Sequence, residues 1–379
     1  MQYHATIFAQ LLKALPRGRF ESIAKCHRQG RRKRSLSDWG HFVAMVFAQA
    51  SGTRSLRDLE RVSERQAGVM THLGIARIRR TTLADANATR PAALFEDVAR
   101  ELAGGLVGGR SYEAIRLIDA TQMFAGRKSD AWTHSGGIKL HMMYDLESTR
   151  PVCFAVTPKN VNDITAAHSM PIEPDTTYVF DKGYYSYSFW AKIDAAGSRF
   201  VTRLKTYSPV QVLIERSVAT IDSAIKRDAT VMLNQRLTLS RHNPLDKPLR
   251  LITVAISTGR EITLISNDLD STAEDIATLY KKRWQIELFF KWIKQNLKLG
   301  HFMGASRNAI IIQIMAALIV YMLLRLAQLK AQTKLGLQAI ARLSTNLLLA
   351  KRPLTDIFKP PPKPPRTTPL QMNLRFNCG

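Results

Sequence analysis

A single carboxylate within a strongly cationic segment is the first feature of this sequence that could do chemistry. The segment YKKRWQIELFFKWIKQNLK, residues 280–298, contains six lysines and arginines but only one acidic residue, Glu287. On one continuous helix, with about 100° between successive residues, four side chains would share a stripe roughly 60° wide: Tyr280, Arg283, Glu287 and Lys294. Glu287 would border the apolar face of this helix. That position favours a functional carboxylate over a solvated glutamate that only balances a neighbouring charge.

Two aspartates in strand-like segments could complete a set of oxygen ligands. Asp119 follows alternating apolar residues in RLIDATQ, where a charged side chain is costly unless it is paired or bound to metal. Asp181 ends the apolar run in YVFDKGYY, where Gly183 permits a sharp turn. Either aspartate alone could be an ordinary turn or capping residue. Together with Glu287 they form a set of three hard oxygen ligands.

Three converging carboxylates would repel one another and raise their pKa values unless divalent cations neutralised them. Mg²⁺ suits such a site because it binds one or two carboxylates together with phosphate oxygens and water. Two ions held in this way can activate a nucleophile and stabilise the leaving oxygen of a phosphodiester. The carboxylates therefore predict a two-ion magnesium site for phosphodiester chemistry.

The charge of the whole chain indicates a polyanionic partner. The 379 residues carry a formal net charge of +25 and have a pI near 10.3. Nucleic acid is the usual partner of such a chain, although ribosomal and membrane-surface proteins share this charge. No glycine-rich loop of the Walker type occurs in the sequence, which argues against the use of ATP.

Cysteine usage and the apolar segments bear on the compartment. Three widely spaced cysteines, Cys26, Cys153 and Cys378, favour a reducing setting over a disulfide or zinc framework. The first residues lack the pattern of a signal peptide, so we expect a cytoplasmic, nucleoid-associated protein. The apolar run AIIIQIMAALIVYMLL, residues 309–324, is shorter than the roughly twenty residues of a membrane span. We therefore expect a buried core helix there and no membrane contact.

Residues 1–105 are basic and predict a helical domain. Apolar residues at helical spacing predict three helices, over residues 37–52, 53–64 and 79–90. We expect the first to end at Gly52 and the last to be capped by Thr81 or Thr82. Short helices, tight turns and arginines are typical of helix-turn-helix DNA binding, and a bundle with a solvated basic face is the alternative. The cationic run at residues 28–34 fits either a phosphate-contacting arm or a loop.

The rest of the chain alternates between strand and helix patterns. Residues 106–206 predict an α/β layer with a mixed sheet: strands over 114–123, 137–146, 150–158, 176–185 and 199–205, and helices over 163–170 and 186–197. Residues 207–266 read almost wholly as strands, with a turn at Thr258 and Gly259, and predict a β insertion. Residues 267–335 would complete the core with two helices, the first beginning near residue 272 at a Ser271–Glu274 capping box. Residues 336–379 predict a basic, proline-rich tail.

These residues carry a resemblance to a known family. The spacing Tyr280-x2-Arg283-x3-Glu287-x6-Lys294 resembles the tyrosine–arginine–glutamate–lysine signature of bacterial insertion-sequence transposases of the DDE class, in the IS-four family. Asp119 in RLIDATQM and Asp181 in VFDKGYYSY match the first and second catalytic aspartates of that family. The predicted β insertion is similar to the one that interrupts its ribonuclease H-like fold. The segment from LLKALPRGRFESIAK to ADANATR also resembles the DNA-binding region of one branch.

The resemblance implies an α/β protein with a ribonuclease H-like catalytic core, a β-strand insertion and a preceding helical DNA-binding domain. It implies a transposase that binds the terminal inverted repeats of its insertion sequence and cuts and joins double-stranded DNA, at transposon ends and target, through a hairpin intermediate. The DNA-bound form would be a homodimer. Asp119, Asp181 and Glu287 would hold two Mg²⁺ ions, with Mn²⁺ as an alternative ion.

The resemblance also implies roles for the basic and aromatic neighbours of Glu287. Arg283 and Lys294 would bind phosphates near the cut, and Tyr280 would pack or hydrogen-bond there. Lys291 is a further phosphate-binding candidate. Trp284 would either stack on a displaced base or belong to the core, and we favour the core.

Two other functions fit the same residues. One is an inactive or domesticated relative that binds DNA without cutting it, and the intact Asp119, Asp181 and Glu287 argue against this reading. The other is a different metal-dependent nuclease on the same fold, such as a junction resolvase, which needs neither the β insertion nor long basic flanks. His134 and His141 flank a glycine turn without a nearby cysteine or acid in the sequence, so we expect them to be structural.

Overall fold

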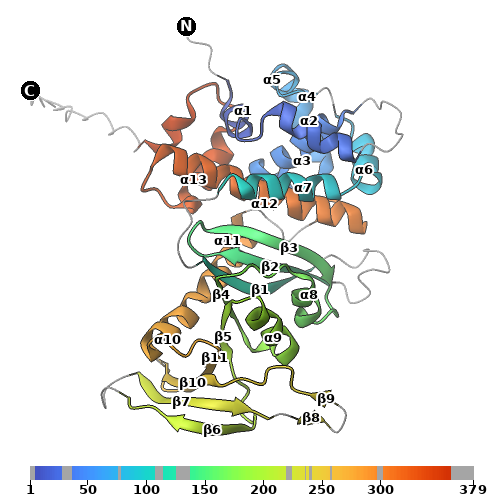
Figure 1. Ribbon diagram of the computed structural model, residues 1–379. Helices are drawn as coiled ribbons and strands as arrows, with labels where there is room; N and C mark the ends of the chain where they lie inside the picture. The colour runs from blue at the N-terminus through green and yellow to red at the C-terminus, as the bar shows by residue number, and fades with distance from the viewer. Residues whose placement is uncertain are drawn as a thin grey trace, which may run out of the picture.

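The chain folds into a helical layer that lies over an α/β layer (Figure 1). The computed structural model describes residues 5–27, 36–75, 78–106, 114–124, 137–218, 224–234, 236–238, 241–256, 258–296 and 302–359. Four features of the sequence lie outside these ranges: the cationic run at residues 28–34, His134, the part of the tail beyond residue 359, and Cys378.

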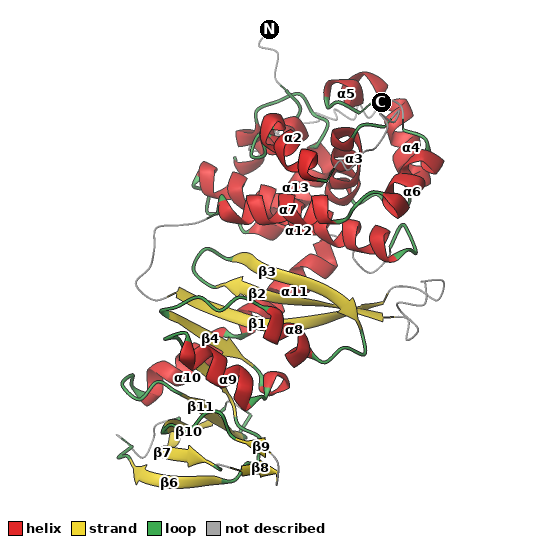
Figure 2. Ribbon diagram, turned by 45° about the vertical axis from the view of Figure 1, so that its right-hand side comes forward, coloured by secondary structure: helices red, strands yellow, loops and turns green. Residues whose placement is uncertain are grey.

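The α/β layer is built on one mixed sheet in the order β3-β2-β1-β4-β5-β11-β10-β7-β6 (Figure 2). Its strands are β1 (Ala114–Phe124), β2 (Gly137–Asp145), β3 (Arg150–Pro158), β4 (Thr176–Phe180), β5 (Arg199–Arg203), β6 (Val210–Glu215), β7 (Ile225–Leu233), β10 (Leu249–Ala255) and β11 (Glu261–Ser266). The β1–β4 and β4–β5 pairs are parallel and the other pairs are antiparallel. A small second sheet pairs β8 (Arg236–Thr238) with β9 (Arg241–His242). The mixed α/β sheet is therefore as predicted.

The predicted β insertion does not form a layer of its own. Its strand β11 pairs antiparallel with β5, so the strands from residue 210 onward extend the sheet that begins with β1 to β5. The turn between β10 and β11 lies where the sequence predicts it, with Gly259 at φ +76°, a conformation that glycine adopts without strain.

The central strand β4 separates two hydrophobic cores. Its side chains alternate between them, as the two-residue period of a strand requires: Val179 faces one core, whereas Tyr178 and Phe180 face the other. Helices α8 (Asp163–Ser169) and α9 (Tyr187–Ala195) belong to the second core, which buries Trp190. Because both faces are covered, every residue of β4 is buried.

The helical layer combines the first and last thirds of the chain. It contains α1 (Ile7–Leu12), α2 (Arg17–Cys26), α3 (Asp38–Ser51), α4 (Leu56–Arg65), α5 (Ala67–His72), α6 (Arg80–Thr89), α7 (Ala93–Gly104), α12 (Arg307–Ala331), α13 (Leu337–Leu347) and the 3₁₀ helix η3 (Leu354–Phe358). Helix α3 begins after its cap Ser37 and ends at Gly52, which is left-handed, as predicted. The cap predicted at Thr81 or Thr82 is wrong, because the cap of α6 is Arg79, two or three residues earlier. The tail predicted from residue 336 is also partly wrong, since α13 and η3 occupy its first half.

Helix α12 is the centre of this layer. It has 25 residues, more than the sixteen-residue apolar run suggests, and it packs against α3, α6 and α7. By length and composition it is the one helix of the described chain that could cross a membrane, and most of its apolar stretch is buried inside the protein. The expectation of a buried helix is thus confirmed, and it packs with the N-terminal helices.

The cationic segment around Glu287 forms two helices, not the single helix predicted. Helix α10 (Ala273–Lys282) ends at Arg283, and α11 (Trp284–Asn296) follows directly. The start near residue 272 is confirmed, but the predicted capping box is shifted by one residue. Thr272 caps α10 by accepting a hydrogen bond from the Asp275 amide at 3.1 Å, while the Ser271 hydroxyl donates to Asp268.

Tyr321 of α12 ties the helical layer to the α/β layer. Its hydroxyl donates to the Thr149 carbonyl at 2.6 Å, and its ring meets Phe289 and Trp292 of α11 edge to face. We expect Tyr321→Phe to lower the free energy of unfolding by about 1 kcal/mol in urea titrations, because the buried carbonyl loses a partner. Tyr207→Phe, at a fully solvated tyrosine, is the matched control. Equal losses in both variants would contradict the role of this hydrogen bond.

Candidate active site

The parallel pairing of β1 and β4 brings two predicted site residues together. Ile118 is the register partner of Phe180, so the next residue on each chain, Asp119 and Asp181, lies at the same level of the sheet. Asp181 follows the last residue of β4 and caps the 3₁₀ helix η2 (Lys182–Tyr184), where its side chain accepts from the Gly183 amide at 2.7 Å. The carboxyl end of a central parallel strand is where sites in open α/β sheets form.

Arg283 connects the third predicted residue to this pair. Its guanidinium donates to Glu287 Oε1 at 2.5 Å, and its other terminal nitrogen lies 3.5 Å from Asp119 Oδ2. The side chains of Asp119 and Arg283 are only 18% and 16% exposed, and that of Glu287 is 33% exposed. Arg283 therefore neutralises two carboxylates in this structure, whereas the sequence predicted that it contacts DNA phosphate.

The charge state of Asp119 reflects all three carboxylates. The pKa of Asp119 is raised to about 6, mainly by burial and also by the charges of Asp181 and Glu287. The Ala120 amide, which donates to Asp119 at 2.8 Å, and the Arg283 guanidinium act in the opposite direction. The ionised form of Asp119 is thus disfavoured mainly by burial, and the charges of the two other predicted ligands add to this effect.

The donor set suits divalent cations, but it is not gathered into a finished metal centre. No three histidine, cysteine or acidic side chains of the described residues lie close enough together to hold an ion as they stand. Instead, the cation between Asp119 and Glu287 is Arg283, whose Nε is buried and has no hydrogen-bond acceptor among the described residues. Carboxylate oxygens are ligands that suit a hard divalent ion.

The predicted DNA-contacting lysines lie in the same hollow as Asp119 and Glu287. This hollow has a volume of about 500 Å³, and Lys291 and Lys294 lie in its lining. Lys291 is exposed, whereas Lys294 is half-buried and its pKa is lowered by burial. Asp181 lines a separate groove of about 720 Å³.

The two aromatic candidates differ in their surroundings. Tyr280 is buried, and its ring centre lies 5.8 Å from the Arg283 guanidinium carbon, so it packs beside the site as expected. Trp284 is 56% exposed. The prediction that it belongs to the core is therefore wrong, because Ile286, Phe290 and their neighbours fill the buried face of α11 without it.

Two further residues near the carboxylates escaped the sequence analysis. Tyr184 is buried, and its hydroxyl has no hydrogen-bond partner among the described residues; burial and the charges of Asp119, Asp163 and Asp181 raise its pKa. Asp163 accepts from Lys139 at 2.9 Å and lies 3.8 Å from His141 Nδ1. The DKGYY motif next to Asp181 was the available signal for Tyr184. The sequence around Asp163 offers no such signal, because its contacts with Lys139 and His141 depend on tertiary packing.

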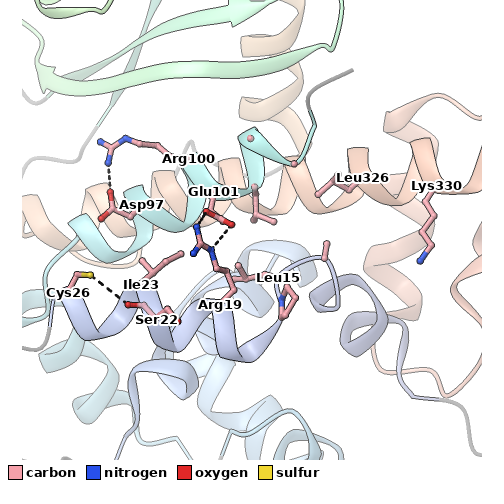
Figure 3. Close-up of a pocket in the computed structure, with 15 residues that line it drawn as sticks. Leu15, Arg19, Ser22, Ile23, Cys26, Asp97, Arg100, Glu101, Leu326 and Lys330 are labelled. Carbon is pink, nitrogen blue, oxygen red and sulfur yellow. Dashed lines mark hydrogen bonds and ion pairs between the residues drawn. The ribbon is translucent and has the colours of Figure 1, made fainter. Parts of the chain in front are cut away.

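A larger hollow lies in the helical layer, away from the carboxylates (Figure 3). It has a volume of about 980 Å³ and lies between α2, α7 and the end of α12. Its arginines are paired: Arg19 donates to both oxygens of Glu101 at 2.7 and 2.8 Å, and Arg100 is paired with Asp97. Size alone therefore does not identify the functional site of this chain.

Comparison with known proteins identifies the family of this chain. Residues 111–323 match the family model of the transposase DDE domain, and residues 3–76 match a domain of unknown function (DUF4372). A Sinorhizobium fredii protein named as transposase y4zB is 38% identical over 309 residues, which cover 78% of this chain and 85% of that protein. A Geobacillus stearothermophilus protein named as a transposase for insertion sequence element IS5377 is 28% identical over 243 residues, or 60% of each chain. The cryo-EM structure of the piggyBac transposase synaptic complex with hairpin DNA has a TM-score of 0.45 and 11% identity, over 90% of this chain and 78% of that chain.

The match to the DDE domain spans more than half of the chain and contains the strands and helices that carry Asp119, Asp181 and Glu287. Domains of this family have a ribonuclease H-like core and depend on divalent metal ions. The length of this match and the 38% identity to the Sinorhizobium fredii relative indicate the same family. The chain belongs to the bacterial insertion-sequence transposases of the DDE class, which are enzymes that act on DNA.

Proposed function

We propose that this transposase cuts and joins DNA at the terminal inverted repeats of its insertion sequence with Asp119, Asp181 and Glu287 as its catalytic residues. One observation carries the assignment. Asp119 and Glu287 share the guanidinium of Arg283, and Asp181 lies at the level of Asp119 on the neighbouring parallel strand. Three partly buried carboxylates repel one another and so oppose folding. In a chain of net charge +25, such a cluster favours a functional role.

The same three carboxylates would hold two Mg²⁺ ions, and Mn²⁺ could replace them. When bound, the ions would activate the attacking oxygen and stabilise the leaving oxygen of the phosphodiester. The protein's own contribution is to keep the ligands close in a partly dry site before the ions arrive. Arg283 does this by offsetting the repulsion between Asp119 and Glu287.

The cations around the carboxylates would hold the DNA backbone. Lys291 and Lys294 line the hollow that contains Asp119 and Glu287, so a phosphate at the cut would lie within their reach. Trp284 is exposed at the start of α11 and offers a face on which a displaced base could stack. Tyr280 would support Arg283 from the buried side.

The remaining parts of the proposal concern assembly and reaction path. Residues 1–105 would bind the inverted repeats, a homodimer would hold two ends and the target, and the protein would act in the cytoplasm at the nucleoid. With one carboxylate cluster for both strands, the 3′-hydroxyl from the first cut would attack the opposite strand. The resulting DNA hairpin would then be opened by water. An inactive DNA-binding relative and a plain nuclease on the same fold are the alternatives that cleavage assays distinguish.

Alanine substitution of Asp119, Asp181 or Glu287 tests the assignment. Each change should slow nicking of end-containing DNA with Mg²⁺ at least about a thousandfold, because a ligand of the reacting centre is lost. Binding to the same DNA should stay within a few-fold, since cations elsewhere hold the backbone. Asp246→Ala, at an exposed aspartate outside the site, is the matched control. Near-normal nicking by any of the three variants would contradict the assignment of that residue as catalytic.

The raised pKa of Asp119 gives a pH-dependent prediction for the metal-free protein. Its pKa of about 6, against an ordinary 3.8, means that the folded state penalises the ionised form. The penalty is absent below about pH 4, grows as pH rises through this window and is complete above about pH 6. In EDTA, Asp119→Asn should therefore raise the free energy of unfolding by about 2 kcal/mol at pH 7.5 and by much less at pH 4.5. A gain that is equal at both pH values would contradict this origin.

Arg283 and Lys294 should differ in the step that they affect. Arg283→Ala removes a charge that lowers the pKa of Asp119, so the pH profile of the first nick should move to higher pH. Lys294→Ala should leave that profile in place and slow hairpin formation and opening more than the first nick. Single-turnover reactions on denaturing gels, where a hairpin migrates as a double-length strand, separate these steps. Identical profiles for both variants would mean that both residues serve binding alone.

A further inference from the structure

A fourth carboxylate lies beside the candidate active site. Asp163 is the first residue of α8, and its side chain is 30% exposed. Helix α8 contacts the 3₁₀ helix η2, which directly follows Asp181. The fold therefore brings Asp163 next to a predicted catalytic residue from which it is separated by strand β4 in the sequence.

Gly183 marks the place where these two carboxylates approach each other. A side-chain carbon at this position would lie 2.8 Å from Asp181 Oδ1 and 3.8 Å from Asp163 Oδ2. Both oxygens thus face the same small space beside Gly183, which a residue without a side chain leaves open. Two carboxylates that face one space repel each other, so a positive charge in that space would stabilise the arrangement.

The two oxygens of Asp163 have different surroundings. Oδ1 accepts a hydrogen bond from the Lys139 ammonium at 2.9 Å, and Lys139 also donates to the Val161 carbonyl at 2.9 Å. Oδ2, the oxygen nearer to Asp181, has no hydrogen-bond partner among the described residues. A carboxylate with one anchored oxygen and one free oxygen is well prepared to bind a cation.

Two buried polar atoms around Asp163 also lack partners. His141 is fully buried, and its Nε2 is bonded to Thr157 Oγ1 at 2.7 Å. Its Nδ1 lies 3.8 Å from Asp163 Oδ1 and has no hydrogen-bond partner among the described residues, and the same is true of the buried Tyr184 hydroxyl. Buried polar atoms are seldom left without a partner unless water, an ion or a ligand completes their surroundings. Both atoms therefore indicate that something binds at this place.

A purely structural ion pair between Lys139 and Asp163 is the alternative. Such a pair occurs elsewhere in the same sheet, where Arg250 donates to both oxygens of Asp228 at 2.5 and 2.6 Å. Asp163 differs from Asp228 because only one of its oxygens is engaged. The other is left beside a second carboxylate, which a structural pair does not require.

We propose that Asp163 is a fourth acidic residue of the active site, and that its free oxygen Oδ2 is a further ligand for the divalent cation that Asp181 would hold. The groups that face the space beside Gly183 are hard oxygen ligands, and Mg²⁺ is bound by one or two carboxylates together with phosphate oxygens and water. Lys139 would be a positioning residue, because it anchors Oδ1 and leaves Oδ2 free. The inference rests on the proposed function, which assigns Asp181 to the metal.

Binding of Mn²⁺ to the full-length protein without DNA, followed by electron paramagnetic resonance, tests the ligand directly. Asp163→Asn keeps the size of the side chain and removes its charge, so it should weaken Mn²⁺ binding about tenfold. In nicking assays the Mg²⁺ concentration for half-maximal rate should rise by a similar factor. At saturating Mg²⁺ the rate should return to within a few-fold of wild type, because the ion then fills the weakened site.

Asp246→Asn, at an exposed aspartate outside the site, is the matched control and should behave as wild type. Unfolding in EDTA shows whether each variant is folded, and Asp163→Ser replaces the asparagine variant if that one is not. Wild-type Mn²⁺ affinity in a folded Asp163 variant would overturn the proposal. So would a loss of rate that saturating Mg²⁺ does not restore, because a structural role has that outcome. The proposal also fails if the free wild-type protein binds no Mn²⁺, since preformed ligands should bind the ion without DNA.

These failures are distinct from failure of the proposed function. If Asp163→Asn binds Mn²⁺ as wild type does while Asp119→Ala and Asp181→Ala no longer nick, the three-carboxylate site stands without Asp163. Conversely, near-normal nicking by Asp181→Ala removes both the proposed role of Asp181 and the inference that rests on it.

Discussion

The electrostatic repulsion among three partly buried carboxylates is the constraint on which the arrangement of the candidate site depends. Asp119 lies on a strand, Asp181 directly follows one and Glu287 lies on a helix, and their like charges repel one another unless a positive charge offsets them. Arg283 supplies that charge from the junction of α10 and α11. The break between these helices is therefore part of the site, because it places the guanidinium of Arg283 between Asp119 and Glu287.

The helical layer packs against α11, the helix that carries Glu287. Phe289 and Trp292 of α11 pack on Tyr321 of α12, and Tyr144 of β2 packs on Phe289. Helix α12 is in turn surrounded by helices from the first hundred residues. Helix α12 therefore contacts both α11 and the N-terminal helices.

The cations of the described chain fall into two groups: those paired with acidic side chains, and those that line the hollows near the carboxylates. Arg116, Arg250 and Arg19 are bonded to acidic side chains and stabilise the fold locally. Lys291, Lys294, Arg203 and Lys205 instead line hollows next to the carboxylates and have no acidic partner among the described residues. A net charge of +25 favours a polyanionic partner, and this distribution supports the proposed DNA-binding place beside the carboxylates.

The sequence by itself determined the main strands, the ends of several helices and the three candidate carboxylates. These follow from local signals: a two-residue apolar period in AIRLIDATQM, a left-handed glycine after residue 51, and charged residues where apolar runs end. The break at Arg283, its pairing with Asp119 and Glu287, and the exposure of Trp284 and Tyr207 were decided by tertiary structure. So was the position of α12 among helices more than two hundred residues earlier in the chain. Each depends on contacts between segments far apart in the sequence, and a local pattern carries no information about which distant surface will cover it.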